Sequence, residues 1–293
     1  MKSTLLRDRR FLPYALIAPA LVILAVFYLY PIGYNAVLSV FSWDLRGPMK
    51  FVGLGNFVEL FSDPNLGKVI QNTLVYMGME VSLVMIFGLI LAIFLNRQGW
   101  LSEFLQGVSF APNVIALVSV SLIFVWLMDT DIGLFNQILG ALGLEPVGWL
   151  SDTQVALFSL VLVSVWKSVG LNALIILSAL QSIPRFLFEA ADLDNASAWT
   201  RFRRITIPMI SPTLFFLVLV NVIGSFQAFD TINVMTQGGP QSSTNTLIFS
   251  VYRQGFEYYR VGYAAAIAVV LMVLVGLITV LYFRAFQKRV HYR

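Results

Sequence analysis

Long apolar stretches alternate with short polar ones along this chain. Six stretches carry at most one charged residue each: 11–43, 69–96, 104–128, 153–184, 205–229 and 261–283. The two charges inside them are Glu80 and Lys167. A helix of about 20 apolar residues crosses the hydrocarbon core of a bilayer, and these stretches do not alternate as barrel strands would. We therefore predict an all-α integral membrane protein with six transmembrane helices.

The expected spans cover about 12–40, 69–96, 104–128, 154–181, 205–229 and 261–283. Only short segments remain between them, so residues 1–293 are expected to form one transmembrane domain without a second soluble domain. The composition agrees, because 58% of the residues are hydrophobic and 12% are charged. Soluble domains are about 45–50% apolar and about 25% charged.

The basic residues predict the orientation, since cytoplasmic loops collect Lys and Arg. One side of a six-span arrangement holds thirteen of them: Lys2, Arg7, Arg9, Arg10, Arg97, Arg185, Arg201, Arg203, Arg204, Arg284, Lys288, Arg289 and Arg293. The other side holds five: Arg46, Lys50, Lys68, Arg253 and Arg260. Both termini are therefore expected in the cytoplasm, and so is the polar loop 182–204.

Several kinds of chemistry have no residues to carry them. There is no cysteine and a single histidine, His291, which excludes thiolate metal sites and histidine-based catalytic sites. No phosphate-binding loop of the G-x-x-x-x-G-K-[ST] type occurs, so the chain is not expected to hydrolyse ATP by itself. We predict that it is not an enzyme and binds neither a cofactor nor a metal.

The loop 182–204 has the signals of a short amphipathic helix. Ser182 and Pro184 are typical of a helix start, and Phe186, Ala190 and Leu193 then share one helical face. Asn195 follows, and asparagine tolerates the left-handed conformation that ends helices. These features fit a docking segment, and they also fit an amphipathic linker whose arginines contact lipid phosphates.

The order of residues in this loop resembles the cytoplasmic motif of ATP-binding-cassette importer permeases, E-A-A-x-x-x-G followed after nine residues by I-x-L-P. The matching positions are Glu189, Ala190, Ala191, Ile205 and Pro208, with Asp194 as the acid that usually precedes the glycine. Asn195 stands in place of that glycine, and Ile207 replaces the leucine. Both replacements are mild, because asparagine adopts the same backbone and isoleucine has the size of leucine.

A second set of residues is similar to permeases of the sugar-importer branch, those of the maltose type and the glycerol-3-phosphate type. It comprises Asn72-Thr73, Phe229-Asp230, Thr236, Gly238-Gly239-Pro240, Thr244, Tyr252 and Gly262-Tyr263-Ala264-Ala265-Ala266. This resemblance covers most of the chain. It implies a type I ABC importer permease fold in a bacterial or archaeal cytoplasmic membrane, surrounded by lipid and without a nucleic-acid partner.

The resemblance also implies partners and a division of labour. The permease would form a heterodimer with a second, homologous permease and would import a sugar or related solute. Two ATP-binding subunits would carry ATP and Mg, and a periplasmic or lipid-anchored solute-binding protein would deliver the solute. Residues 185–194 would be the coupling helix. The expected ATPase-coupling residues are Arg185, Glu189, Ala190, Ala191, Asp194, Asn195, Ile205 and Pro208.

Polar residues within two spans are candidates for the solute path. They are Ser164, Lys167, Ser168 and Asn172 in the fourth span, and Asn221 and Ser225 in the fifth. Helical spacing puts each set on one face, where its members bind solute or bond to neighbouring helices. Lys167 has two alternative roles, to neutralise an anionic solute or to pair with Glu80. A neutral sugar, an acidic sugar and a glycerophosphate all remain candidates for the solute.

The alternative function is an ion-coupled secondary transporter for a small polar solute. Such a transporter relays protons or ions through acids and histidines inside its spans. Here the acids concentrate in the loops, with Glu80 as the exception. The absence of an acid cluster within the spans favours the importer permease.

Overall fold

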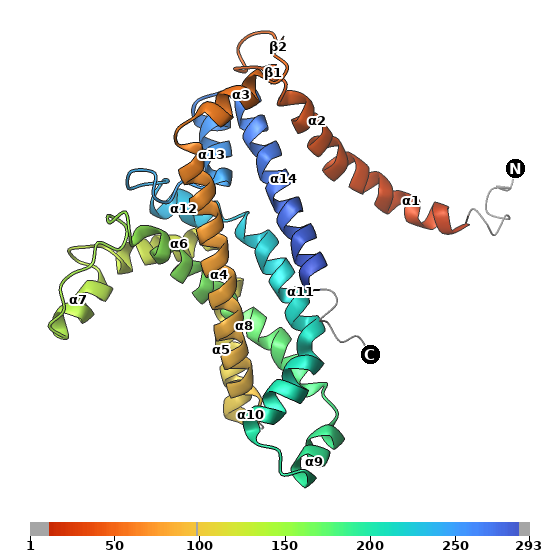
Figure 1. Ribbon diagram of the computed structural model, residues 1–293. Helices are drawn as coiled ribbons and strands as arrows, with labels where there is room; N and C mark the ends of the chain where they lie inside the picture. The colour runs from red at the N-terminus through yellow and green to blue at the C-terminus, as the bar shows by residue number, and fades with distance from the viewer. Residues whose placement is uncertain (1–11, 98, 287–293) are drawn as a thin grey trace, which may run out of the picture. The chain divides into compact units, whose positions relative to one another are not determined.

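The computed structural model describes residues 12–97 and 99–286, and its regular structure is almost entirely helical (Figure 1). Contacts divide the chain into two compact units. The first contains residues 12–63 and 251–270, and the second contains 64–250 and 271–286. The basic residues before position 12 and after position 286, on which the predicted orientation partly depends, lie outside the described residues.

The first unit begins with one long apolar helix and a small hairpin. Its elements are α1 (Leu12–Leu24), the π-helical turn η2 (Ala25–Leu29), α2 (Tyr30–Leu38), β1 (Phe41–Ser42), β2 (Lys50–Phe51), α3 (Gly55–Ser62), the π-helical turn η4 (Arg253–Glu257) and the first part of α14 (Val261–Phe286). β1 and β2 pair antiparallel, with Phe41 opposite Phe51. The helix from α1 to α2 is apolar and exposed along most of its length, as expected where a helix faces lipid or another subunit.

Contacts with the backbone carbonyls of residues 39 and 41 hold the first unit together around the hairpin. Asn56 of α3 donates from Nδ2 to the carbonyl oxygens of Ser39 (2.8 Å) and Phe41 (2.9 Å). A Cβ at Gly262 would lie 1.8 Å from the Phe41 carbonyl oxygen, so only glycine lets α14 begin against this strand.

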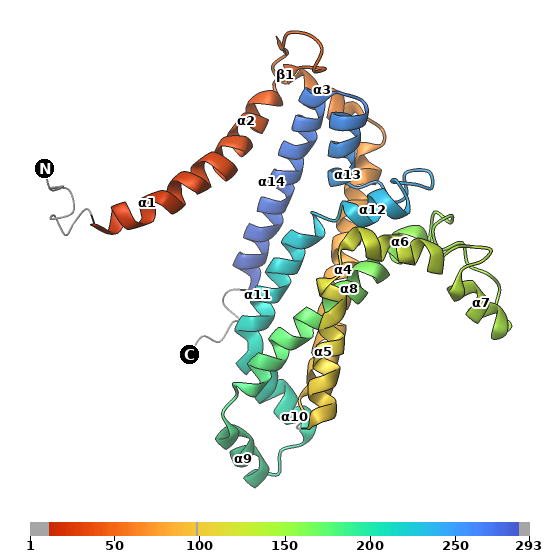
Figure 2. The same ribbon diagram turned by 180° about the vertical axis from the view of Figure 1, so that it is seen from behind.

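The second unit contains the other helices. They are α4 (Leu66–Leu95), α5 (Trp100–Val114), α6 (Leu117–Leu127), α7 (Leu134–Ala141), α8 (Ala156–Gln181), α9 (Arg185–Leu193), α10 (Ala198–Arg201), the π-helical turn η3 (Phe202–Thr206), α11 (Ile207–Ser225), α12 (Asp230–Met235) and the start of α13 (Leu247–Tyr252). Figures 1 and 2 both place α9 and α10 at one end of this unit and α12 towards the other.

The core of the second unit lies between α4, α8 and α11. Ala92, Ala173, Ile176 and Leu217 are almost fully buried there in one apolar cluster. Small residues bring the backbones close together: a Cβ at Gly88 would already lie 3.4 Å from the Cβ of Asn172. Such small-residue contacts allow helices to pack inside a bilayer, where the hydrophobic effect does not drive association.

The membrane fold is confirmed by the helices themselves. Among the described residues, five helical segments are long and apolar enough to cross a bilayer: Pro13–Leu38, Leu66–Leu95, Ala156–Gln181, Ala198–Ser225 and Val261–Phe286. A sixth span is present if α5 and α6 count together, although they are bent by 97°. The prediction of six transmembrane helices agrees with this arrangement, with the expected third span as the bent pair.

The bend in the third span lies at the two residues between α5 and α6. Ile115 and Ala116 have extended backbones, with ψ values of 139° and 132°, and they end α5 before α6 begins. Pro112 lies in the last turn of α5 and has no N–H to donate. The carbonyls around this break therefore need other donors.

Candidate functional site

The predicted coupling helix is α9, and its end has the expected geometry. Pro184 is extended, with φ −62° and ψ 132°, and α9 begins at the next residue, Arg185. At the other end Asn195 is left-handed, with φ 48°. The N–H of Ala196 then reaches back to the Ala191 carbonyl oxygen at 2.9 Å, which satisfies one of the last carbonyls of the helix. Asparagine therefore takes the role that glycine has in the motif.

α9 has an inner and an outer face. Leu187 and Phe188 pack against the apolar core, and Ala191 is buried. On the outer face the side chains of Phe186 and Leu193 are 64% and 86% exposed. Glu189, Ala190 and Asp194 are exposed as well, so most of the motif points away from the unit. An exposed apolar face of this kind is typical of a docking surface.

The second half of the loop connects α9 to α11. Arg201 of α10 forms an ion pair with Asp192 of α9. The rings of Trp199 and Phe202 stack with centroids 5.6 Å apart. Of the remaining motif positions, Ile205 lies in η3 and Pro208 is the second residue of α11, where its missing N–H is tolerated.

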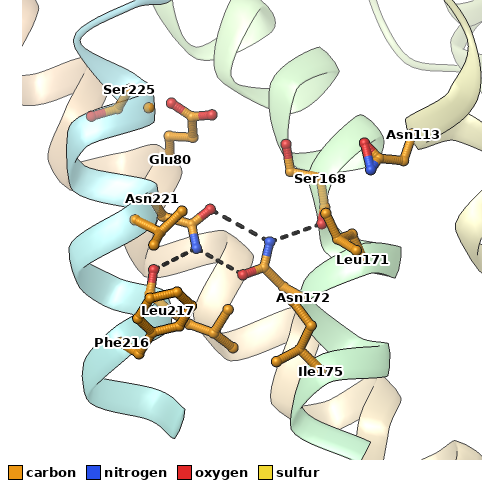
Figure 3. Close-up of a pocket in the computed structure, with 12 residues that line it drawn as sticks. Glu80, Asn113, Ser168, Leu171, Asn172, Ile175, Phe216, Leu217, Asn221 and Ser225 are labelled. Carbon is orange, nitrogen blue, oxygen red and sulfur yellow. Dashed lines mark hydrogen bonds between the residues drawn. The ribbon is translucent and has the colours of Figure 1, made fainter. Parts of the chain in front are cut away.

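The polar residues of the spans gather around a cavity of about 280 Å³ in the second unit (Figure 3). Among its lining residues, Asn172 of α8 and Asn221 of α11 point towards one another. Asn221 Nδ2 donates to Asn172 Oδ1 at 2.7 Å, and Asn172 Nδ2 donates to Asn221 Oδ1 at 3.4 Å. The pair links two spans inside a region of size suited to a small solute.

The two amide groups can still accept hydrogen bonds at their oxygens but have no hydrogen left to donate. Asn172 Nδ2 also donates to the Ser168 carbonyl oxygen at 3.0 Å, and Asn221 Nδ2 also donates to the Leu217 carbonyl oxygen at 2.7 Å. Both hydrogens of each amide are thereby used, whereas each amide oxygen has two lone pairs and accepts one bond from its partner. A ligand with hydroxyl donors suits these oxygens.

The structure brings four of the six predicted path residues together. Ser168, Asn172, Asn221 and Ser225 line the cavity. Ser164 is buried elsewhere, where its Oγ lies 2.6 Å from the hydroxyl of Tyr76.

The ammonium group of Lys167 contacts backbone carbonyls and not the carboxyl group of Glu80. Its Nζ donates to the carbonyl oxygens of Pro112 (3.2 Å), Asn113 (3.1 Å) and Ile115 (2.6 Å). These are carbonyls at the break between α5 and α6. Three ammonium protons match three acceptors, and Glu80 is not an ion-pair partner of Lys167 in the described part of the chain. The lysine fixes a bent span.

Sequence reasoning missed two polar residues that line the cavity. Asn113 of α5 is one, and Glu80 of α4 is the other, since Glu80 was considered only as a partner for Lys167. A signal for Glu80 was present, because an acid inside an apolar span is a functional candidate by itself. No pattern marks Asn113, which reaches the cavity through the bend at the end of α5.

Several residues of the second motif group hold the loop 236–247 in place. Asn72 of α4 donates from Nδ2 to the carbonyl oxygens of Ser242 (2.9 Å) and Asn245 (3.0 Å). Thr73 accepts at Oγ1 from the N–H of Leu247 at 3.0 Å. A Cβ at Gly238, which has φ +80°, would lie 2.6 Å from the Phe249 ring. These residues fix the loop on the end of α4.

A bundle of apolar helices with a polar cavity between its spans and an exposed amphipathic loop defines a membrane permease. The chain belongs to the family of binding-protein-dependent transport system inner membrane components, whose model matches residues 84–292. It is therefore a multi-pass inner-membrane protein and a transport component. The prediction that it is not an enzyme agrees with its relatives, which are transport permeases.

Individual relatives match nearly the whole chain. The sn-glycerol-3-phosphate transport system permease protein UgpA of Yersinia pestis is 37% identical over 284 residues, which are 96% of each chain. The lactose transport system permease protein LacF of Rhizobium radiobacter is 35% identical over 280 residues, 93% of each chain. A chain of a bacterial alginate ABC transporter, crystallised with a periplasmic protein that holds an alginate pentasaccharide, has the same fold, with TM-score 0.84, 23% identity and 98% of each chain covered.

Proposed function

We propose that this chain is the permease subunit of an ABC importer for a sugar or a related hydroxylated solute. It forms the translocation path together with a second, homologous permease. Two separate ATP-binding subunits carry ATP and Mg, and they drive the path through α9. A solute-binding protein delivers the solute, in keeping with the family of binding-protein-dependent systems.

The connection between α9 and the cavity carries this proposal. Residues 182–206 join α8 directly to α11 (Figure 1), and these two helices hold Asn172 and Asn221. From Asn172 to its end at Gln181, α8 continues for nine residues, which is about 14 Å at 1.5 Å per helical residue. A force on α9 therefore acts on both halves of the amide pair through two stiff helices, as a rigid-body rotation of spans requires.

The outer face of α9 suits a protein partner. Phe186 and Leu193 offer apolar area, and Glu189 between them offers a carboxylate for a basic residue of the ATPase. The ion pair of Asp192 with Arg201 braces α9 against α10 from the other side. Arg185, Ala190, Ala191, Asp194, Asn195, Ile205 and Pro208 complete the proposed coupling segment.

Charge supports a cytoplasmic position for this segment and for both termini. Arg185, Arg201, Arg203 and Arg204 lie in or beside it, and such clusters remain on the cytoplasmic side of the membrane. The ATPases and their nucleotide then contact α9, while the solute-binding protein contacts the opposite face.

The solute class follows from the cavity and is in keeping with the relatives. Asn172 and Asn221 have free acceptor capacity for hydroxyl groups. Ser168 and Ser225 add hydroxyls of their own. The names of two relatives refer to sn-glycerol 3-phosphate and lactose, which are both hydroxylated solutes.

The proposed function is tested by asking which energy source drives uptake. The complete transporter is reconstituted in proteoliposomes, and uptake of labelled solutes is followed with ATP at the ATPase face or with ion gradients imposed instead. ATP-dependent, vanadate-sensitive uptake that needs the binding protein is expected, because separate ATP-binding subunits and a binding protein belong to the proposed binding-protein-dependent system. Uptake that runs on a proton or sodium gradient and ends with an ionophore would instead identify a secondary transporter.

A further inference from the structure

Two arginines line a cavity of about 430 Å³ at the place where two spans end. α4 ends at Leu95 and α8 ends at Gln181. Arg97 follows the first of these ends, and Arg185 follows the second. Because polar groups at the ends of spans lie at the level of the lipid headgroups, the cavity lies at that level of the membrane.

The cavity is positively charged, and the chain does not neutralise it. Guanidinium groups stay protonated in proteins, and neither Arg97 nor Arg185 forms an ion pair with a described acid. The described residues that line the cavity include no Asp or Glu, whereas Asn96 and Gln181 add amide groups that can donate. Arginine binds phosphate oxygens through parallel N–H bonds, so the lining suits a phosphate group.

An apolar groove of about 320 Å³ adjoins the cavity, because Arg97 lines both. The groove is also lined by Phe94, Trp100 and Leu101, which are all more than half exposed. Arg97 Cζ lies 5.6 Å from the centroid of the Phe94 ring, which favours a position of the charge beside the groove. Tryptophan is typical of the boundary between acyl chains and headgroups. A ligand that fills both spaces carries a phosphate and a hydrocarbon chain.

The cavity belongs to the inner side of α9 and not to its proposed docking face. Phe188, which packs against the apolar core, lines the cavity, whereas Phe186 and Leu193 of the outer face do not. Figures 1 and 2 both place the start of α5 at the same end of the unit as α9. A subunit docked on the outer face of α9 therefore does not have to occupy this cavity.

We propose that the cavity and the groove together bind one phospholipid with an anionic headgroup. Arg97 and Arg185 hold its phosphate, and one acyl chain lies in the groove beside Trp100. Basic pockets between membrane helices recognise anionic headgroups in this way, and a headgroup with an ammonium group would be repelled by the two guanidinium groups. The bound lipid joins the ends of α4 and α8 to the start of α9. This inference goes beyond the proposed function, because it depends only on the ends of the spans.

Lipid binding to the full chain in detergent, followed by native mass spectrometry, tests the site. Phosphatidylglycerol and phosphatidylethanolamine with the same acyl chains are titrated separately, because they differ in headgroup charge. The unmodified protein should bind phosphatidylglycerol at least about fivefold more tightly, which is the contribution of one arginine beside an anionic lipid. Equal affinity for the two lipids would overturn the inference.

Substitutions in the two halves of the site separate charge from apolar contact. Arg97→Gln should weaken phosphatidylglycerol binding at least about fivefold, and Arg97→Lys should weaken it less because the charge remains. Trp100→Ala should weaken the binding of both lipids. The matched control is Arg204→Gln, an exposed arginine that lines neither the cavity nor the groove, and it should change affinity by less than about twofold. Gel filtration of each variant verifies that it is folded.

Two results would assign the cavity to another occupant and overturn the inference. Inorganic phosphate has no acyl chain and should not displace phosphatidylglycerol; displacement would indicate a site for soluble anions. Arg97→Gln should still co-purify with the ATP-binding subunits, and loss of these subunits at unchanged lipid affinity would indicate a protein interface. Unchanged lipid affinity in both Arg97→Gln and Trp100→Ala also contradicts the site. The lipid titration does not involve solute uptake, so its outcome is independent of the proposed function.

Discussion

The contact of α5 with α8 at Gly170 allows a quantitative prediction. A Cβ at this position would lie 1.7 Å from the carbonyl oxygen of Ser109 and 2.5 Å from its carbonyl carbon. Carbon and carbonyl oxygen atoms in contact are about 3.3 Å apart, so Gly170→Ala must separate the two backbones by about 1.5 Å. Both contact atoms belong to the main chain, and a rotamer change therefore cannot relieve the clash.

We expect Gly170→Ala to destabilise the protein by at least about 3 kcal/mol, the upper end for an overpacked site. In a chain of 293 residues that lowers the midpoint of thermal unfolding by about 5 °C. The shift is measured by heating the detergent-solubilised protein and following its monodisperse fraction by gel filtration. Gly78→Ala on α4 is the control, because its added Cβ would have no heavy atom within 4 Å. Equal midpoints for the two variants would refute the reasoning.

Two further predictions concern Lys167 and Leu193. Lys167→Met removes three hydrogen bonds to backbone carbonyls and should lower the free energy of unfolding by about 2–4 kcal/mol, measured as a lower thermal midpoint. The preference between uncharged and anionic solutes should not change. A changed preference at unchanged stability would place Lys167 in the solute site. Because the chain has no cysteine, Leu193→Cys labelled with a maleimide–benzophenone reagent should photocrosslink to an ATPase subunit, whereas Leu142→Cys, also highly exposed and labelled in the same way, should not. Crosslinking of both or of neither would contradict the docking role of α9.

The sequence alone predicted the elements that depend on local interactions along the chain. Gaps between charges located the membrane helices, because a long apolar segment in lipid must be helical. Pro184 and Asn195 marked the two ends of α9, since each restricts or permits one backbone conformation.

The bend of the third span was beyond sequence reasoning. The stretch 104–128 is apolar throughout, and Pro112 alone would be tolerated in a kinked helix. The break at Ile115 and Ala116 depends on Lys167 as a donor from another helix. Hydrophobic periodicity contains no information about such a donor.

The partners of Lys167 and Glu80 could not be assigned for a related reason. Two charges in apolar spans invite an ion pair, because burial of either alone is costly. Whether they meet depends on how their helices rotate and pack. The structure gives the ammonium group three carbonyls and leaves the carboxyl group on the cavity.

The faces of α8 and α11 were more predictable than the contacts they make. Ser168 with Asn172, and Asn221 with Ser225, follow helical spacing and do share the cavity. The direct amide pair between Asn172 and Asn221 required tertiary structure, because it depends on how two spans pack together.

The central claim is that ATP hydrolysis in other subunits drives this permease through α9, and Glu189→Lys tests it most directly. ATP-driven uptake by the complete reconstituted transporter should fall to less than about a tenth, because reversing one partner of an interfacial charge contact costs several kcal/mol. Glu145→Lys reverses another exposed acid, in the loop after α7, and should leave uptake within about twofold, as is usual for surface substitutions. Normal uptake by the Glu189→Lys transporter would contradict the account.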